Sequence, residues 1–137
     1  MAFECRRSGH GVERRRHLTQ LVVAGDGDTL GKIAIGHAMR MAQRITGRSK
    51  VLVPQLSDPE RLSVIHTYCQ PREMESAIEV VTVAADPTSG RLDLADLKTK
   101  LGDDVAAVYF ENPAYLGTIE TGAAEIAKLA RAAGAET

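Results

Sequence analysis

Residues 25–29 combine two glycines, two aspartates and a threonine between an apolar run and a long helical pattern. Such a loop offers free backbone N–H groups and the positive end of a helix dipole to an anion, typically phosphate. Gly27 lets the backbone come close and Thr29 can cap the helix, whereas Asp26 and Asp28 repel a phosphate. The glycine spacing of a dinucleotide fingerprint and the lysine of a P-loop are missing. The pattern alone therefore leaves open a phosphate site and an ordinary capped turn, and it favours the turn.

A second group with possible chemistry is Glu111-Asn112-Pro113, directly after the continuous apolar run 105–110. Ligands of open parallel sheets collect at the carboxyl ends of the strands. There Asn112 can hydrogen-bond a ring or a carboxylate, while Pro113 stiffens the exit. The alternative interpretation is a plain strand-ending turn.

No residue is expected to act as a catalyst. The chain has no convincing nucleophile–base pair and no serine motif of a hydrolase. His37 falls on the apolar stripe of a helix, which is typical of a core or partner-facing residue. His66 and Cys69 form at most half of a metal site, so no metal is expected. None of the lysines stands where a Schiff-base lysine should, in a pocket that lowers its pKa; they are Lys32, Lys50, Lys98, Lys100 and Lys128.

Strands and helices alternate in the pattern that must position these groups. Apolar, β-branched runs predict the strands, and apolar residues at helical spacing predict the helices. Ser57 or Asp58 caps the second helix, with Pro59 in its first turn. Four strand–helix units call for a parallel sheet covered by helices on both faces, a three-layer α/β sandwich. The predicted strands are 20–24, 51–53, 78–83 and 105–110, the predicted helices are 30–45, 57–70, 93–101 and 121–133, and another strand is expected at the end of the chain.

The composition is that of a folded domain. Of 137 residues, 44% are hydrophobic and 26% charged, close to the averages of globular proteins, with a formal net charge of -1. No apolar run is long enough to span a membrane, and the two distant cysteines indicate a reduced, cytoplasmic protein. Few aromatics and a balanced charge make nucleic acid an improbable partner.

Residues 1–20 differ from the rest of the chain, since they are rich in arginine and poor in large apolar residues. We expect a flexible basic arm, with residues 21–137 forming the α/β unit. The arm is interpreted as a solvated tail or a segment that packs on a partner chain. A role in binding acidic surfaces or nucleic acid, and a cleaved targeting peptide, are the less favoured alternatives.

Two stretches in this order resemble the P-protein of the glycine cleavage system, specifically subunit 1 of glycine dehydrogenase (decarboxylating). The first comprises GDGDTL at 25–30 and AMRMAQRITGRSKVLV at 38–53. The second is VYFENPAYLGTIE at 108–120, followed by the helix at 126–135. The resemblance covers 21–137. Departures are Glu111 where glutamine is usual, Ser-Asp-Pro at 57–59 in place of a His-Pro step, and the segment before Leu21.

The resemblance implies part of the large domain of an aspartate-aminotransferase-like, fold type I protein. The complete P-protein uses pyridoxal phosphate to decarboxylate glycine and passes the aminomethyl group to the lipoyl arm of the H-protein. In two-subunit forms the cofactor belongs to the second subunit, so this chain is expected to be inactive alone and to form a hetero-oligomer. The resemblance places Asp26, Gly27, Asp28 and Thr29 near the cofactor phosphate, and Asn112 and Pro113 by the active-site mouth. The alternatives are another fold type I decarboxylase or aminotransferase, and a non-catalytic scaffold for a partner subunit.

Overall fold

The computed structural model describes residues 29–71 and 76–137. The basic segment 1–20, the strand predicted at 20–24 and the candidate residues Asp26, Gly27 and Asp28 lie outside these ranges. Within them, the helices and strands follow one another in the predicted order. They are α1 (Thr29–Thr46), β1 (Lys50–Pro54), α2 (Pro59–Cys69), β2 (Glu79–Val83), α3 (Leu94–Lys100), β3 (Val105–Val108) and α4 (Ala123–Ala132).

The strands form a parallel sheet in the order β2-β1-β3, so β1 lies in the middle. Near the end of the chain, Glu136 forms a parallel bridge with Ala107 on the outer side of β3. Two backbone hydrogen bonds hold this bridge, from Val108 to the Glu136 carbonyl (2.8 Å) and from Glu136 to the Ala106 carbonyl (2.9 Å). The pairing occurs where the alternation predicts a further strand.

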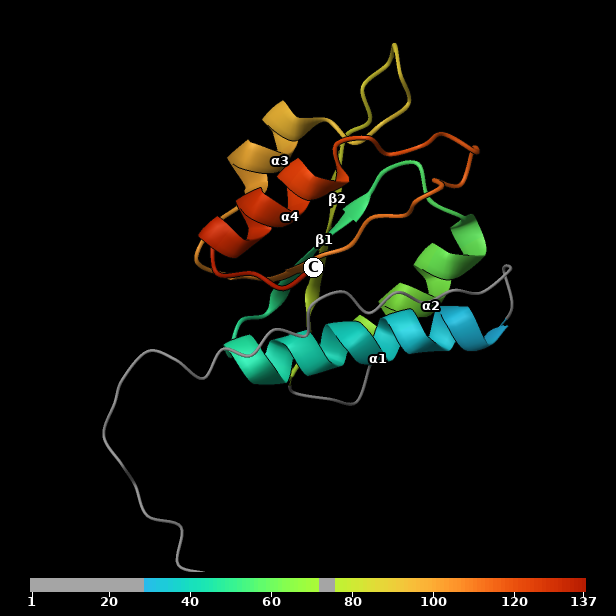
Figure 1. Ribbon diagram of the computed structural model, residues 1–137. Coiled ribbons are helices and arrows are strands. Elements are labelled where there is room, and N and C mark those ends of the chain that lie inside the picture. Colours follow the sequence, from blue (N-terminus) through green and yellow to red (C-terminus); the bar gives the residue numbers. More distant parts are fainter. Residues whose placement is uncertain (1–28, 72–75) are drawn as a thin grey trace, which may run out of the picture.

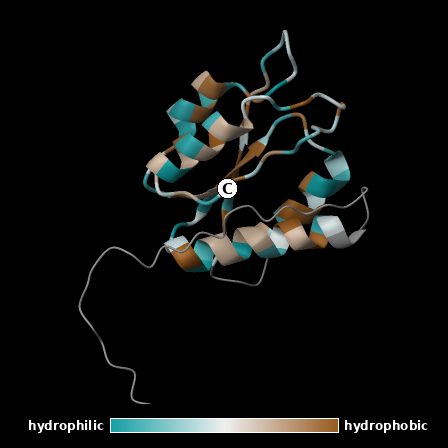
Figure 2. Ribbon diagram, viewed as in Figure 1, coloured by the Kyte–Doolittle hydropathy of each residue, from teal (hydrophilic) through white to brown (hydrophobic). Residues whose placement is uncertain are grey.

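Helices cover both faces of the sheet, α1 and α2 on one side and α3 and α4 on the other (Figure 1). Figure 2 shows apolar residues in the strands and along the helices, and the buried ones form two clusters, one on each face of the sheet. Because successive side chains of a strand point to opposite faces, Val51 and Val53 pack under α1 and α2, while Leu52 packs under α3 and α4. The predicted three-layer α/β sandwich with a parallel sheet is therefore confirmed.

Short-range capping sets where two of the helices begin. The Asp58 carboxylate accepts a hydrogen bond from the Glu60 amide (3.1 Å), so Asp58 caps α2. Ser57 instead donates to the Pro54 carbonyl (3.0 Å), which closes the turn after β1. In the same way Asp93 accepts from the Ala95 amide (2.8 Å) and caps α3. The capping of α2 thus falls to the second of the two residues that the sequence offered.

Polar contacts link the strands at the edge of the sheet where their amino-terminal ends lie. Lys50 pairs with Asp104 and Glu79, each on a neighbouring strand or just before it. Arg48 donates through one nitrogen to the Val105 carbonyl (2.9 Å) and to the Ala133 carbonyl at the end of α4 (2.8 Å).

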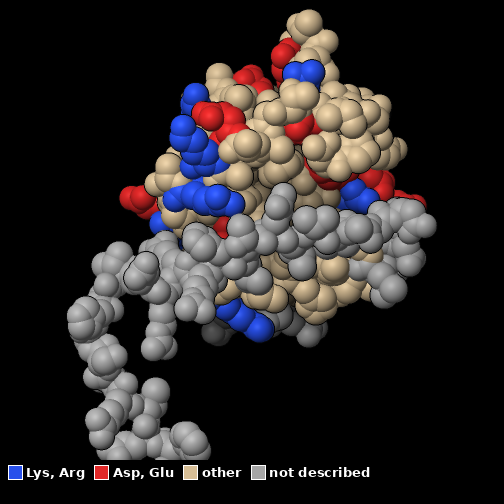
Figure 3. Space-filling model, in the orientation of Figure 1, with Lys and Arg blue, Asp and Glu red and all other residues tan. Residues whose placement is uncertain are grey.

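Charged side chains of both signs are mixed on the face shown in Figure 3. Among the described residues no helix is long and apolar enough to cross a membrane.

Cys69 is expected to be chemically silent in the folded chain. Its side chain is fully buried between α1 and α2, with Sγ 3.7 Å from the Met39 sulfur. Burial raises the pKa of the thiol to about 11, so almost no thiolate exists at neutral pH. In a Cys5→Ser chain, a disulfide reagent should therefore react with Cys69 only as fast as the chain unfolds. Rapid stoichiometric labelling of a folded sample would contradict the burial.

Asp96 should make stability depend on pH in the acid range. Its carboxylate accepts from the Ala84 amide (2.6 Å) and from the Lys100 ammonium (2.6 Å), and these two contacts, the backbone bond first, lower the pKa of Asp96. Because the folded-state pKa lies below the unfolded value of about 4, the stabilisation is complete above that value. It is lost as the pH falls through the folded-state pKa.

Urea unfolding of Asp96→Asn and the wild type should therefore differ at pH 7, and the difference should shrink steadily below about pH 4. Asp103→Asn is the matched control, because Asp103 is an exposed carboxylate on the turn before β3. A difference for Asp96→Asn that persists unchanged in acid would show that the charge is not its source.

Candidate functional site at the carboxyl ends of the strands

The carboxyl ends of β1 and β3 lie side by side, and the predicted site residues Asn112 and Pro113 follow β3. β3 ends at Val108, earlier than predicted, but Tyr109 still donates to the Leu52 carbonyl (2.8 Å). Asn112 and Pro113 are both exposed, and the peptide bond between them is cis. The two residues are thus placed at the sheet edge where the sequence predicted them.

The side chain of Asn112 is engaged within the chain. Its Nδ2 donates to the Glu120 carbonyl (3.4 Å), and its Oδ1 accepts from the Glu120 amide (3.3 Å). The Glu120 carboxylate is buried and accepts from the Leu92 amide (3.0 Å) and the Gly122 amide (2.9 Å). Asn112 therefore closes the loop 112–120, and its contacts are long enough to be exchanged for others.

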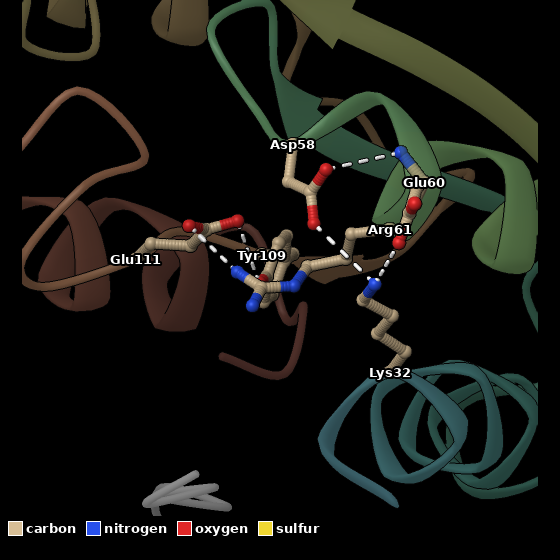
Figure 4. Close-up of polar contacts among 6 residues, drawn as sticks. All are labelled: Lys32, Asp58, Glu60, Arg61, Tyr109 and Glu111. Carbon is tan, nitrogen blue, oxygen red and sulfur yellow. Dashed lines mark hydrogen bonds and ion pairs between the residues drawn. The ribbon is translucent and has the colours of Figure 1, made fainter. Parts of the chain in front are cut away.

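Thr29 is the first residue of α1. Lys32, one turn further, pairs with Glu60 and with Asp58 (3.8 Å) at the start of α2 (Figure 4). The hydrogen bond that Lys32 donates to the Glu60 carboxylate is the largest cause that raises the pKa of Lys32, so the amine stays protonated. The structure therefore ties the beginning of α1 to the helix that leaves the carboxyl end of β1.

An ion pair that sequence reasoning missed joins α2 to the end of β3. Arg61 donates to a Glu111 carboxylate oxygen (2.7 Å), and the other oxygen accepts from the Tyr109 hydroxyl (2.9 Å; Figure 4). Only 16% of the Arg61 side chain and 9% of the Glu111 side chain are exposed. The Arg61 Nε is also buried, and no described residue accepts its hydrogen. The guanidinium is thus largely committed to Glu111.

The electrostatics of this group keep each partner in its bonded form. Burial lowers the pKa of Arg61, but the hydrogen bond and the charge of Glu111 outweigh it and leave a net rise. Burial is also the main reason that the pKa of the Tyr109 hydroxyl is raised, and the Glu111 carboxylate raises it further. At neutral pH Tyr109 is therefore a neutral donor and Arg61 is a cation.

A sequence signal for this pair did exist. Arg61 lies in the first turn of α2, the helix that follows β1, and Glu111 lies shortly after β3. Adjacent parallel strands bring their carboxyl ends to one edge of the sheet. The strand order is what a single sequence does not supply. Without it, an arginine and a glutamate 50 positions apart give no reason to be paired.

A small hollow opens at the same edge on the side of α3 and α4. Its lining includes Gln55, Arg91, Phe110 and Ala114 together with the carboxyl ends of β1 and β2. Among the residues that the structure describes, no three His, Cys, Asp or Glu side chains gather as metal ligands. His66 is exposed and Cys69 buried, so the two do not converge.

The described lysines do not fit a covalently attached pyridoxal phosphate, whose lysine must be deprotonated beside the cofactor. Lys32 is held protonated by Glu60, and Lys100 pairs with Asp96. Lys50 lies at the opposite edge of the sheet and also has a raised pKa, chiefly through Asp104. Lys98 and Lys128 are exposed on helices. No described lysine meets the requirement.

The chain is similar in sequence to known proteins. No family model matches it. Curated relatives named "Probable glycine dehydrogenase (decarboxylating) subunit 1" do match. The protein of Aeropyrum pernix is 40% identical over 89 residues, 64% of this chain and 18% of the relative. That of Staphylothermus marinus is 36% identical over 97 residues (70% and 20%), and that of Saccharolobus islandicus 33% over 99 residues (72% and 21%).

Solved structures agree with the sequence comparison. A glycine decarboxylase (P-protein) of the glycine cleavage system, in inhibitor-bound form, superposes with a TM-score of 0.64 at 31% identity, covering 76% of this chain and 21% of that one. A sphingosine-1-phosphate lyase of Burkholderia pseudomallei, at 15% identity and a TM-score of 0.56, shares the fold. Both likenesses support the predicted fold type I architecture.

The chain spans about a fifth of the length of the curated relatives that it matches. The predicted resemblance is confirmed over most of the chain. The chain is a relative of glycine dehydrogenase (decarboxylating) subunit 1 and corresponds to one segment of its fold type I domain.

Proposed function

We propose that the chain serves as part of a glycine-cleavage decarboxylase. In such an assembly glycine is decarboxylated and its aminomethyl group passes to the lipoyl arm of an H-protein. The observation that carries the proposal is identity of 33–40% to relatives named subunit 1 over most of the chain. The partners are a second P-protein subunit and the lipoylated H-protein. The buried, unpaired Cys69 favours a reducing compartment, the cytoplasm.

Pyridoxal phosphate is the cofactor of the proposed assembly, and we assign its lysine to the second subunit. The support is the state of the described lysines, which are paired with carboxylates, exposed, or at the wrong edge of the sheet. When bound, the cofactor would withdraw electrons from the amino acid. This chain would contribute Asn112 and Pro113 at the sheet edge and Thr29 at the start of α1, together with the preceding residues Asp26, Gly27 and Asp28.

The test is a titration of the purified chain with pyridoxal phosphate, with and without a second P-protein subunit. Borohydride reduction followed by mass spectrometry of the peptides locates any Schiff-base lysine. We expect no reduced adduct on the isolated chain, and exchange of glycine carboxyl carbon with labelled bicarbonate only when the partner is present. Asn112→Ala should weaken that exchange, and Leu116→Ala, at an exposed loop position, is its control.

Other outcomes would select the alternatives. A stoichiometric adduct on one lysine of the isolated chain would contradict the assignment and indicate a self-contained fold type I enzyme. Association with the partner without any glycine exchange would instead indicate a non-catalytic scaffold.

A further inference from the structure

Two consecutive residues after β3 are anchored in opposite directions. Tyr109 and Glu111, two positions apart, meet at the tyrosine hydroxyl, as side chains on the same side of an extended segment do. Asn112 directly follows Glu111, and its side chain points to the opposite side of the segment. There both polar atoms of the Asn112 side chain contact the backbone of Glu120. The direction of Asn112 therefore depends on where Glu111 is held.

Glu111 is held by Arg61. Its two carboxylate oxygens have separate partners, Arg61 at 2.7 Å and Tyr109 at 2.9 Å. Only 9% of the Glu111 side chain is exposed. In so shielded a place a charge-assisted hydrogen bond is stronger than in water, and a carboxylate without its cation is strongly disfavoured. Glu111 therefore has one strongly preferred position.

Arg61 is itself fixed at its base. Asp58 caps the helix that carries it, and Lys32 of α1 contacts both Asp58 and Glu60 in the first turn of that helix (Figure 4). Two sets of polar contacts, joined by the backbone of the first turn of α2, thus link α1 to the residue that precedes Asn112.

We propose that Arg61 is a positioning residue. Acting through Glu111, it fixes the exit of β3 so that Asn112 is held toward Glu120, and Lys32 ties this arrangement to the first turns of α1. The inference rests on the proposed function only in treating Asn112 as a site residue. It is tested on the chain alone, so its failure is distinguishable from failure of the proposed function.

The chain offers an unusually clean probe, because Asn112 is its only asparagine. Selective nitrogen-15 labelling of asparagine gives one side-chain amide pair, whose shifts report the contacts with Glu120. In Arg61→Met the pair should move toward the shifts of a free amide. Exchange of the Glu120 amide hydrogen should become about five- to tenfold faster, as loss of one modest hydrogen bond allows. Arg61→Lys should restore part of the wild-type signal.

Arg44→Met is the matched control, since Arg44 is exposed near the far end of α1. Arg44→Met should leave both readouts unchanged. The exchange rates of the β1 amide hydrogens should stay at their wild-type values in every folded variant. If Arg61→Met does not fold, Glu111→Gln replaces it, because the amide keeps the shape of Glu111 but loses its charge. A wild-type Asn112 signal in a folded Arg61→Met chain, or in folded Glu111→Gln if the first variant fails, would overturn the proposal.

Discussion

Replacing Leu52 by alanine should lower the free energy of unfolding by about 3 kcal/mol, within the range for a leucine removed from a tight core. Leu52 is fully buried in β1, the middle strand, and packs among the side chains of α3, α4 and the neighbouring strands. Neighbours on both sides prevent the sheet from closing the cavity. Urea unfolding followed by circular dichroism measures the loss, which should appear as a lower midpoint with an unchanged slope.

The matched control is Leu116→Ala, the same chemical change at a leucine that is 66% exposed in the loop after β3. Its effect should stay within about 0.5 kcal/mol. Equal losses at the two positions would mean that β1 is not central to the core, and the layer assignment would then be wrong.

Gly36→Ala should also destabilise the chain, by about 2 kcal/mol, although alanine is the better helix former. A Cβ at Gly36 would lie 2.5 Å from Cγ of Tyr68 and 2.8 Å from its Cβ and Cδ2. These atoms belong to the base of the side chain, so α1 and α2 must separate to make room. Thermal or urea unfolding measures the loss.

Tyr68→Ala supplies the internal control for Gly36→Ala. It removes Cγ and Cδ2 but keeps the Cβ at 2.8 Å, so Gly36→Ala should cost clearly less in that background. A double-mutant cycle gives the coupling directly. Additive losses would show that the close approach of the two helices at Tyr68 is not the cause. Tyr68 also contacts His37 edge-on, with ring centroids 5.0 Å apart, and His37 is exposed rather than in the core.

Leu52→Ala and Gly36→Ala are also expected to disturb the candidate site, because its residues are spread over several helices and strands. Its residues stand on the end of β3, on the first turn of α2 and at the start of α1. A loosened contact between α1 and α2 would move Lys32 relative to Asp58, and a loosened β1 would move Arg61 relative to Glu111.

The order of the helices and strands could be predicted from the amino-acid sequence alone. Apolar runs and helical spacing depend only on neighbours within a few residues, so 51–53, 78–83 and 93–101 were found close to β1, β2 and α3. The two stretches at 25–53 and 108–120 indicated the relationship to the glycine dehydrogenase subunit and hence the fold type, and the comparisons confirm that relationship. The cap of α2 was narrowed to Ser57 or Asp58 for the same local reason.

The face of the sheet on which each β1 side chain lies could not be predicted in this way, because a continuous apolar run shows no alternation of polar and apolar residues. It follows from the packing of the helices on the sheet. The tertiary structure also decided that Asn112 turns to Glu120 and that Arg61 meets Glu111. Such contacts depend on strand order and on the packing of helices from distant parts of the chain. The free energies that select them come from burial shared among many residues, and no local pattern encodes that sum.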